Sequence, residues 1–102
     1  MTRTVVFSAQ AERQLDALYR YIEEYSSTAR AESFVGGIVA YCHAFEPFPE
    51  RGTRRDDIRP GLRVLGYRRR VSIAFTAEAD TIAVLGVYYG GQDYEADLKD
   101  EG

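Results

Sequence analysis

The sequence predicts an α+β domain in which a small antiparallel β-sheet carries an N-terminal helical hairpin on one face. Residues 9–45 contain two segments with an apolar residue at every third or fourth position, as in amphipathic helices. Residues 62–89 contain segments of alternating or continuous apolar residues, as in strands. A sheet with a helical hairpin on one face buries both sets of apolar residues. The predicted order is β-α-α-β-β-β.

The first predicted elements are a short strand and a long helix. Thr4 to Phe7 is a β-branched and aromatic run that is typical of a strand. Ser8 follows and can cap a helix, because its hydroxyl can accept a hydrogen bond from a free backbone N–H of the first turn. The helix extends from Ala9 to Tyr25, and its predicted buried face comprises Ala11, Leu15, Leu18, Ile22 and Tyr25.

A second helix follows a break at residues 26–28. It is predicted from Ala29 to Phe45, with a buried face made of Ala31, Phe34, Val35, Ile38, Cys42 and Phe45. A connection this short makes the two helices antiparallel. Gly36 and Gly37 each cost about 1 kcal/mol of helix stability relative to alanine, so we expect another element to approach them closely. Pro47 and Pro49 end the helical region.

The C-terminal half is predicted to supply the rest of the sheet. Residues 50–60 show no clean periodicity and are expected to be irregular. Three strands are predicted after them, at residues 62–65, 67–77 and 81–89. A turn at Gly66 separates the first two strands, and a short loop at 78–80 separates the last two. Gly90 and Gly91 end the last strand, and the acidic residues beyond them are expected to form a loose tail. The sheet face opposite the helices is left for arginines or for a partner.

Composition restricts the class of protein. The 102 residues are enough for one domain, predicted at 1–102, and the apolar share of 45% excludes a disordered chain. Cys42 is the only cysteine, so no intrachain disulfide can form and a reducing compartment fits best. The sequence contains neither a membrane-spanning apolar run nor the pattern of a secretory signal. A cytoplasmic protein without membrane association is therefore expected.

Basic residues are concentrated in one segment. Residues 51–70 contain eight of the thirteen lysine and arginine residues, although the net charge of the chain is −3. All eight are arginines, whose planar, forked donors suit carboxylates and phosphates. We therefore predict a surface that binds an acidic partner, using the arginines Arg59, Arg63, Arg68, Arg69 and Arg70. The alternative is a solvated arginine-rich sheet face that pairs with acids of the same chain.

The sequence offers few groups for catalysis. His43 is the only histidine and adjoins Cys42, so the two would not share a helix face, and no metal or cofactor site is predicted. One enzyme class remains, a metal-independent ribonuclease in which arginines surround the scissile phosphate and a tyrosine moves the proton. The candidate residues for it are Arg63, Arg68, Arg70, Tyr67, Tyr88 and Tyr89. The alternative is that Tyr88 and Tyr89 are amphipathic residues at the edge of the core.

Several motifs resemble one known family in their order and spacing. Val6-Phe7-Ser8 is followed by Ala11 and Leu15 at the opening of the first helix, and Arg59-Pro60-Gly61-Leu62-Arg63 leads into the first C-terminal strand. Further along are Gly66-Tyr67-Arg68-Arg69-Arg70-Val71 and Val84-Leu85-Gly86-Val87, the latter before Gly90-Gly91-Gln92-Asp93. The chain is similar in these motifs to the RelE/ParE toxin superfamily, and specifically to its ParE branch of plasmid-stabilisation toxins. The resemblance covers nearly the whole chain and implies the same fold.

The resemblance implies the toxin of a type II toxin–antitoxin pair. ParE-type toxins poison DNA gyrase without catalytic residues of their own. They are neutralised by a ParD-type ribbon-helix-helix antitoxin, through which the complex binds operator DNA. The residues expected to bind antitoxin or target are the five arginines above, with Tyr88, Tyr89, Gln92 and Asp93. Gln92 stands where the branch commonly has an arginine.

The RelE branch is the alternative, because its members are ribosome-dependent mRNA endonucleases. Those toxins are typically strongly basic, whereas this chain is net acidic and has one lysine, Lys99. Its last strand ends in Tyr88-Tyr89 with no arginine or histidine beside them. A third possibility is an inactive relative that only binds an antitoxin.

Overall fold

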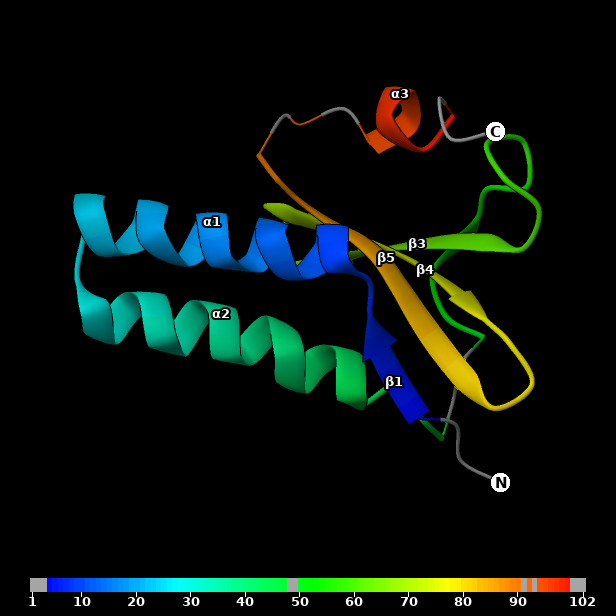
Figure 1. Ribbon diagram of the computed structural model, residues 1–102, viewed down its shortest axis with the longest axis horizontal. Helices are drawn as coiled ribbons and strands as arrows, with labels where there is room; N and C mark the ends of the chain where they lie inside the picture. Colours follow the sequence, from blue (N-terminus) through cyan, green and yellow to red (C-terminus); the bar gives the residue numbers. More distant parts are fainter. Residues whose placement is uncertain (1–3, 48–49, 91, 93, 100–102) are drawn as a thin grey trace.

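The computed structural model of the chain describes residues 4–47, 50–90, 92 and 94–99. Two long helices lie side by side and pack on one face of a sheet, and a short third helix lies near the C-terminus (Figure 1). In chain order the elements are β1 (Thr4–Phe7), α1 (Ala9–Tyr25), α2 (Thr28–His43), β2 (Thr53–Arg54), β3 (Leu62–Tyr67), β4 (Val71–Ala77), β5 (Thr81–Tyr89) and α3 (Tyr94–Lys99). The expected α+β architecture with its helical hairpin is confirmed.

The sheet has the strand order β1-β5-β4-β3-β2 and is mixed. Strands β2 to β5 pair antiparallel, as the sequence predicts. Strand β1 instead pairs in parallel with β5, with Val5 opposite Ile82. Parallel pairing is possible because β1 and β5 are far apart in the sequence, so that the intervening chain forms the long crossover connection that parallel strands require. The two-residue strand β2 lies in the segment that we expected to be irregular.

Helix α1 begins at the predicted cap. The Ser8 hydroxyl accepts a hydrogen bond from the Ala11 N–H at 3.0 Å and donates one to the Leu85 carbonyl at 3.0 Å, which fixes the helix start to β5. Most of the predicted apolar face is buried in the core, but Tyr25 is 71% exposed. Its assignment to the buried face is wrong because the end of the helical hairpin projects past the sheet (Figure 1).

Helix α2 ends at His43, two residues earlier than predicted. The Phe45 N–H donates to the Cys42 carbonyl in a tight turn, and the Phe45 ring is fully buried against Phe75. Of the two mid-helix glycines, only Gly37 has the close neighbour that we expected. A Cβ at Gly37 would lie 2.5 Å from the Tyr67 hydroxyl oxygen, whereas a Cβ at Gly36 would have nothing within 4 Å.

The hairpin between β3 and β4 turns later than the sequence predicts. Gly66 is paired with Ser72 inside the ladder, so the expected turn at Gly66 is wrong. Pairing continues to Tyr67 opposite Val71, and residues 68–70 form the turn. The Tyr67 ring packs on Phe34 and Tyr41 of α2 at centroid distances of 6.0 and 4.9 Å. Packing of this ring favours two more residues of strand than predicted, which moves the turn onto the arginines.

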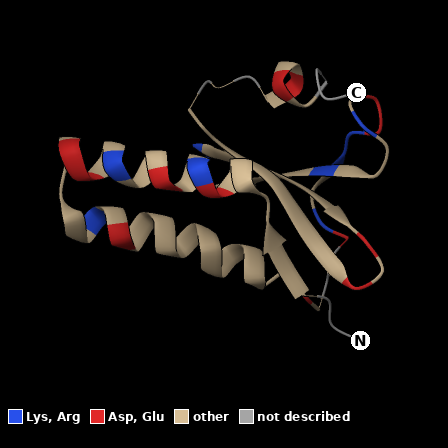
Figure 2. Cartoon of the chain, in the orientation of Figure 1, with Lys and Arg blue, Asp and Glu red and all other residues tan. Residues whose placement is uncertain are grey.

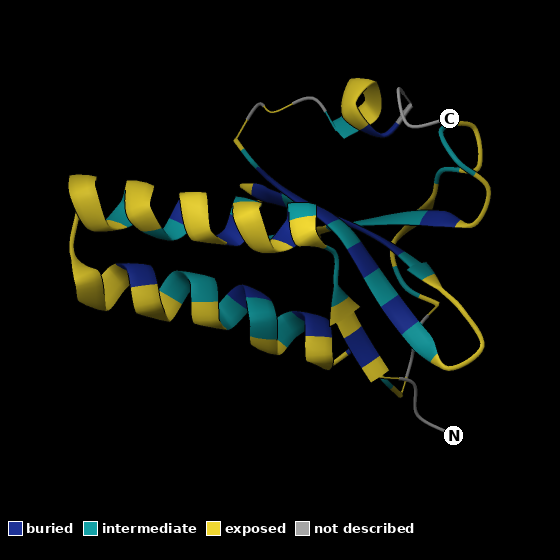
Figure 3. Ribbon diagram, viewed as in Figure 1, coloured by how far each residue is buried: buried dark blue, intermediate teal, exposed yellow. Residues whose placement is uncertain are grey.

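The sheet face opposite the helical hairpin holds a second, smaller core. Its buried members are Leu62, Ala74, Tyr88 and Leu98. Leu98 belongs to α3, so the expectation of a loose tail is wrong for residues 94–99. Burial follows the central strands and the inner sides of α1 and α2 (Figure 3). Among the described residues, no helix has both the length and the apolar character needed to cross a membrane.

Candidate partner-binding site

The arginines predicted to form one surface lie in two groups at opposite ends of β3. The loop arginines are Arg51, Arg54, Arg55, Arg59 and Arg63, and the turn arginines are Arg68, Arg69 and Arg70. Arg63 and Arg68 are five positions apart along the strand, which corresponds to about 17 Å at the usual strand rise. Figure 2 shows basic residues at both ends of the sheet. The structure therefore does not bring Arg59 and Arg63 together with Arg68, Arg69 and Arg70.

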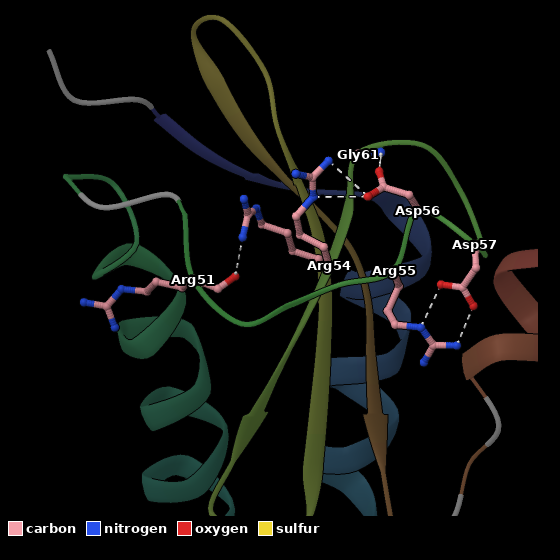
Figure 4. A network of polar contacts seen from close by, with 7 residues as sticks. Arg51, Arg54, Arg55, Asp56, Asp57 and Gly61 are labelled. Carbon is pink, nitrogen blue, oxygen red and sulfur yellow. Dashed lines mark hydrogen bonds and ion pairs between the residues drawn. The ribbon is translucent and has the colours of Figure 1, made fainter.

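The loop arginines bond to groups of the same chain. Arg55 makes a two-pronged contact with Asp57 at 3.0 and 2.9 Å (Figure 4). It also forms an ion pair with Glu95 at 3.3 Å. The hydrogen bond to Asp57, with further help from Glu95, raises the pKa of Arg55. Arg55 also donates to the Tyr94 hydroxyl at 3.0 Å. Through these bonds Arg55 attaches α3 to the loop before β3.

The remaining loop arginines have a similar structural role. Arg59 donates to the Leu98 carbonyl at 3.1 Å, and Arg63 donates to the Arg51 carbonyl at 3.5 Å. Arg54 bonds to Asp56 at 3.1 Å, as Figure 4 shows. The Asp56 carboxylate also accepts the Gly61 N–H at 2.8 Å, and this bond, with the Arg54 charge, lowers the Asp56 pKa. This end of the sheet therefore matches the alternative prediction, in which arginines pair with acids of their own chain.

The turn arginines have a different environment. Arg68 and Arg69 have φ angles of 51° and 62°, and the Arg70 N–H donates to the Tyr67 carbonyl at 3.2 Å. Positive φ at both central residues is the pattern of a type I′ turn, which favours asparagine and glycine. A side chain in this conformation costs about 1–2 kcal/mol per residue. None of the three turn arginines forms an ion pair with a residue in the described ranges.

A hollow of about 400 Å³ lies between the turn arginines and the projecting end of the helical hairpin. We call it the arginine hollow; its lining comprises Tyr21, Ile22, Tyr25, Ser26, Arg30, Ser33, Phe34, Arg68, Arg70 and Tyr89. Its aromatic rings touch one another, with centroid distances of 4.9 Å for Tyr21–Tyr25, 6.1 Å for Tyr21–Tyr89 and 6.2 Å for Phe34–Tyr89. Among the residues that the structure describes, three guanidinium groups and no carboxylate face this aromatic wall.

A second hollow of about 340 Å³ adjoins the first and shares Tyr21 and Tyr89 with it. This apolar hollow is otherwise lined by Gln14, Ala17, Leu18, Val87 and Gln92. The side chain of Gln92 accepts the Tyr89 N–H at 2.7 Å, so it covers the end of β5. Tyr89 and Gln92, both predicted as site residues, therefore border the hollows. Asp93 lies outside the described residues.

Tyr88 faces the other side of the sheet and is only 4% exposed. Its hydroxyl donates to Asp97 at 2.6 Å and lies 3.3 Å from the Gln10 amide nitrogen, which itself contacts Asp97. Burial raises the Tyr88 pKa, and the hydrogen bond to Asp97 raises it further. The alternative reading of Tyr88 as a core residue matches this position, because α3 covers the ring and separates it from any partner.

The groups most often used in catalysis are not in the hollows. Cys42 is fully buried, and burial raises its pKa to about 12. His43 lies at the other end of α2, with its Nδ1 3.3 Å from a Glu46 carboxylate oxygen. Within the part of the chain that the structure describes, no three acidic, histidine or cysteine side chains gather as they would for a metal ion. The arrangement is suited to binding an anion beside an apolar surface.

Among the residues that line the arginine hollow, sequence reasoning predicted only Arg68, Arg70 and Tyr89 as site residues, and it missed the exposed aromatic and cationic residues of the helical hairpin. Tyr21 and Tyr25 are 51% and 71% exposed, and Arg30 approaches from the start of α2. A usable signal was the spacing of the two tyrosines, which places them one turn apart at the C-terminal end of the helix. Exposed aromatic residues beside cations are typical of binding surfaces.

Comparison with known proteins identifies one family. Residues 5–94 match the family model described as the ParE toxin of the type II toxin–antitoxin system, parDE. Among solved structures, the chain is similar to the chromosomal ParDE TA system from P. aeruginosa, with a TM-score of 0.75. The sequence identity is 22%, and the match covers 87% of this chain and 97% of that chain. At this identity the likeness establishes the fold. No curated protein matches the sequence.

Proposed function

The chain belongs to the ParE toxin family of type II toxin–antitoxin systems, and from this premise we propose that it poisons DNA gyrase by binding to it. The supporting observation is the arginine hollow, in which three guanidinium groups that form no ion pair with a described residue stand beside exposed aromatic rings. Such a surface can hold an acidic macromolecule through charge-assisted bonds and apolar contact. In this proposal the toxin needs no catalytic group, cofactor or metal, and it acts in the cytoplasm, where gyrase works.

The chemistry of the hollow supports binding over bond cleavage. A nuclease needs a group that gives and takes a proton near neutral pH. As far as the structure describes it, the lining of the arginine hollow contains no histidine or carboxylate. The pKa of the buried Tyr88 is raised away from that range by its environment. The net charge of −3 also opposes entry into a ribosomal site surrounded by phosphate.

We further propose that a ParD-type ribbon-helix-helix antitoxin neutralises the chain and supplies the operator-DNA contact of the complex. The proposed antitoxin-binding residues are Arg68, Arg69, Arg70, Tyr89 and Gln92, which border the two hollows or the turn beside them. Arg59 and Arg63 are proposed as a second contact region at the opposite end of β3. Their bonds to the chain's own carbonyls would have to be shared with the partner or replaced.

Expression of the chain without antitoxin tests the proposed target. Gyrase poisoning predicts induction of the DNA-damage response and accumulation of cleaved DNA, while transcripts stay intact. The purified chain should then inhibit supercoiling by gyrase and stabilise its cleaved complex with DNA. Rapid cutting of messages at ribosomes with undamaged DNA would instead establish the endonuclease activity of the RelE type. Full growth and intact DNA and RNA would identify an inactive relative.

A further inference from the structure

We propose that the arginine hollow binds one nucleotide, with its phosphate among Arg30, Arg68 and Arg70 and its base against the exposed ring of Tyr25. The ligand chemistry is a phosphate joined to an aromatic base, which a free nucleotide and the terminal nucleotide of a DNA strand both present. A nucleotide at this place would compete with the protein partners proposed for the same surface, but the inference does not depend on the identity of those partners.

The cations of the hollow converge from two parts of the chain. Arg30 lies in the first turn of α2, whereas Arg68 and Arg70 lie in the turn between β3 and β4. None of the three forms an ion pair with a residue in the described ranges. The side chains of Ser26 and Ser33 belong to the same lining and add hydroxyl donors. Forked guanidinium donors and hydroxyls together suit a phosphate group, whose oxygens accept several hydrogen bonds.

The tyrosines supply the surface that a base requires. Tyr21 and Tyr25 have ring centroids 4.9 Å apart, and they are 51% and 71% exposed. Tyr21 also contacts Tyr89, which in turn contacts Phe34, so the exposed rings rest on a packed aromatic layer. Bases of every kind can stack on an aromatic side chain, because each base has a π-face. The Tyr25 ring therefore offers a stacking surface in the same hollow as the three cations.

The size and charge of the surroundings limit the ligand to one nucleotide. The volume of about 400 Å³ lies within the range of about 300–1,000 Å³ that is usual for small-ligand sites. Glu23, Glu24 and Glu32 are exposed at the same end of the helical hairpin, where they would repel further phosphates. The net charge of −3 likewise opposes a long polyanion. The expected ligand is therefore a mononucleotide or the last nucleotide of a strand.

Backbone strain at the turn also indicates a binding role. Arg68 and Arg69 have φ angles of 51° and 62°, which an Asn-Gly pair would adopt with less strain. The sequence thus keeps two long cationic side chains where they destabilise the hairpin. Strain of this kind is concentrated at ligand-binding sites. We infer that the turn presents its arginines to a ligand at a cost in fold stability.

An acidic peptide is the other occupant that the charge of the hollow admits. Its carboxylates would use the arginines, but they have no aromatic group to place against Tyr25. A nucleotide uses the cations and the exposed ring at once, because its phosphate and base are held a fixed short distance apart. The combination of unpaired cations with an open aromatic face therefore favours the nucleotide.

The test titrates the full-length chain with four ligands and follows its backbone amide signals by NMR. The ligands are AMP, ribose 5-phosphate, which lacks the base, adenosine, which lacks the phosphate, and a hexaglutamate peptide. We expect AMP to shift the signals of Tyr25, Arg30 and Arg70 and to bind about tenfold or more tightly than the other three. Equal affinity of AMP and ribose 5-phosphate would contradict stacking of the base. Tighter binding of hexaglutamate than of AMP would assign the hollow to an acidic peptide and overturn the proposal.

Two further ligands distinguish the sources of the nucleotide. A short oligothymidylate with a 5′-phosphate that binds more tightly than AMP would identify a strand end as the source, and weaker binding would identify the free nucleotide. The same oligonucleotide without its 5′-phosphate should bind more weakly than the phosphorylated one. Equal and tight binding of both would mean that the interior of a strand is recognised, which contradicts a site for one nucleotide.

Variants test the two halves of the site separately. Arg30→Gln combined with Arg70→Gln should weaken AMP about tenfold or more, while the weak binding of adenosine stays the same. Tyr25→Ala should weaken AMP and leave ribose 5-phosphate unchanged, and the exposure of the ring makes loss of folding unlikely to follow. Arg54→Gln is the matched control at the other end of β3, where the arginine is paired with Asp56, and it should leave all affinities unchanged.

A turn variant guards against loss of folding. Arg68→Asn combined with Arg69→Gly suits the type I′ turn, so it should fold at least as stably as the unsubstituted chain and still bind AMP more weakly. Unchanged AMP affinity in this variant and in the variant without Arg30 and Arg70 would overturn the proposal. Gyrase is absent from these titrations, so a failed gyrase assay and a failed nucleotide titration are separate results.

Discussion

The Tyr67 hydroxyl occupies the space that a Cβ at Gly37 would need, so β3 and α2 meet at a point where only glycine fits without a shift. Contacts of the same ring with Phe34 and Tyr41 fix its position on the helix. Arg68 follows directly, and its guanidinium lies 5.5 Å from the centre of the Tyr67 ring. The close approach of helix and strand at Gly37 therefore sets where the arginine turn begins.

Alanine substitutions at the two adjacent glycines should have opposite effects on stability. Gly36→Ala should raise the free energy of unfolding by about 0.5–1 kcal/mol, because it improves helix propensity and a Cβ there meets nothing within 4 Å. Gly37→Ala should lower it by about 1–2 kcal/mol, because the Tyr67 ring must move. Urea denaturation of both variants measures the difference, and equal effects would mean that the ring moves freely.

Much of the fold could be predicted because its elements are specified by local patterns. Helix α1 has a cap at Ser8 and a regular apolar face, and β4 and β5 read directly as strands. Two features depended on contacts between distant residues and could not be predicted. The turn moved from Gly66 to the arginines because Tyr67 packs on α2, and α3 formed because Leu98 is buried beneath it.

The candidate site could be predicted only in part, because charge density along a sequence does not show which charges already have partners. Arg55 and Arg68 belong to the same arginine-rich segment, yet the first is paired with Asp57 and Glu95 and the second forms no ion pair within the described ranges. Arg55 has these partners because it lies in the loop before β3, beside Asp57 of the same loop and Glu95 of α3. Tyr25 illustrates the opposite error, since its helical spacing indicated burial while the helix extends past the sheet.

Glycine at residue 69 should stabilise the chain. Arg69→Gly removes the strain of a side chain at a φ of 62°, and we expect the free energy of unfolding to rise by about 1 kcal/mol. Arg70→Gly is the control, because residue 70 is not among the residues with positive φ. It should lose about 0.5–1 kcal/mol to added backbone freedom. Thermal unfolding compares the two, and a similar loss in both would mean that the turn is unstrained.

The Tyr88 hydroxyl should contribute to holding α3 on the sheet. Tyr88→Phe removes its bond to Asp97, so we expect a loss of about 1 kcal/mol and faster amide hydrogen exchange across residues 94–99. Tyr25→Phe removes a hydroxyl from a ring that is 71% exposed and should change stability by less than about 0.5 kcal/mol. If exchange in α3 did not respond to Tyr88→Phe, its attachment would depend on its other contacts, which include the buried Leu98 and the bonds from Arg55 and Arg59.

The loop before β3 should make stability depend on acidic pH through Asp56. The bond from the Gly61 N–H and the charge of Arg54 hold the pKa of Asp56 below its unfolded value. A carboxylate of this kind contributes stability that is present above the unfolded pKa and is lost as pH falls through the folded pKa. Urea midpoints measured from pH 6 down to pH 2 should therefore fall less steeply for Asp56→Asn than for the unsubstituted chain. Parallel curves would show that the Asp56 charge contributes nothing to folding.

The Cys42 thiol should be almost unreactive in the folded chain. It is fully buried, and burial raises its pKa to about 12, so at pH 8 it carries roughly a thousandfold less thiolate than an exposed cysteine. An aromatic disulfide reagent should modify it slowly in buffer and rapidly in denaturant. Ala40→Cys combined with Cys42→Ala places the thiol at an exposed position of α2 and should restore fast modification in buffer. Rapid modification of the unsubstituted chain would mean that the core between α2 and the sheet opens readily, since reagent reaches this sulfur only when the two separate.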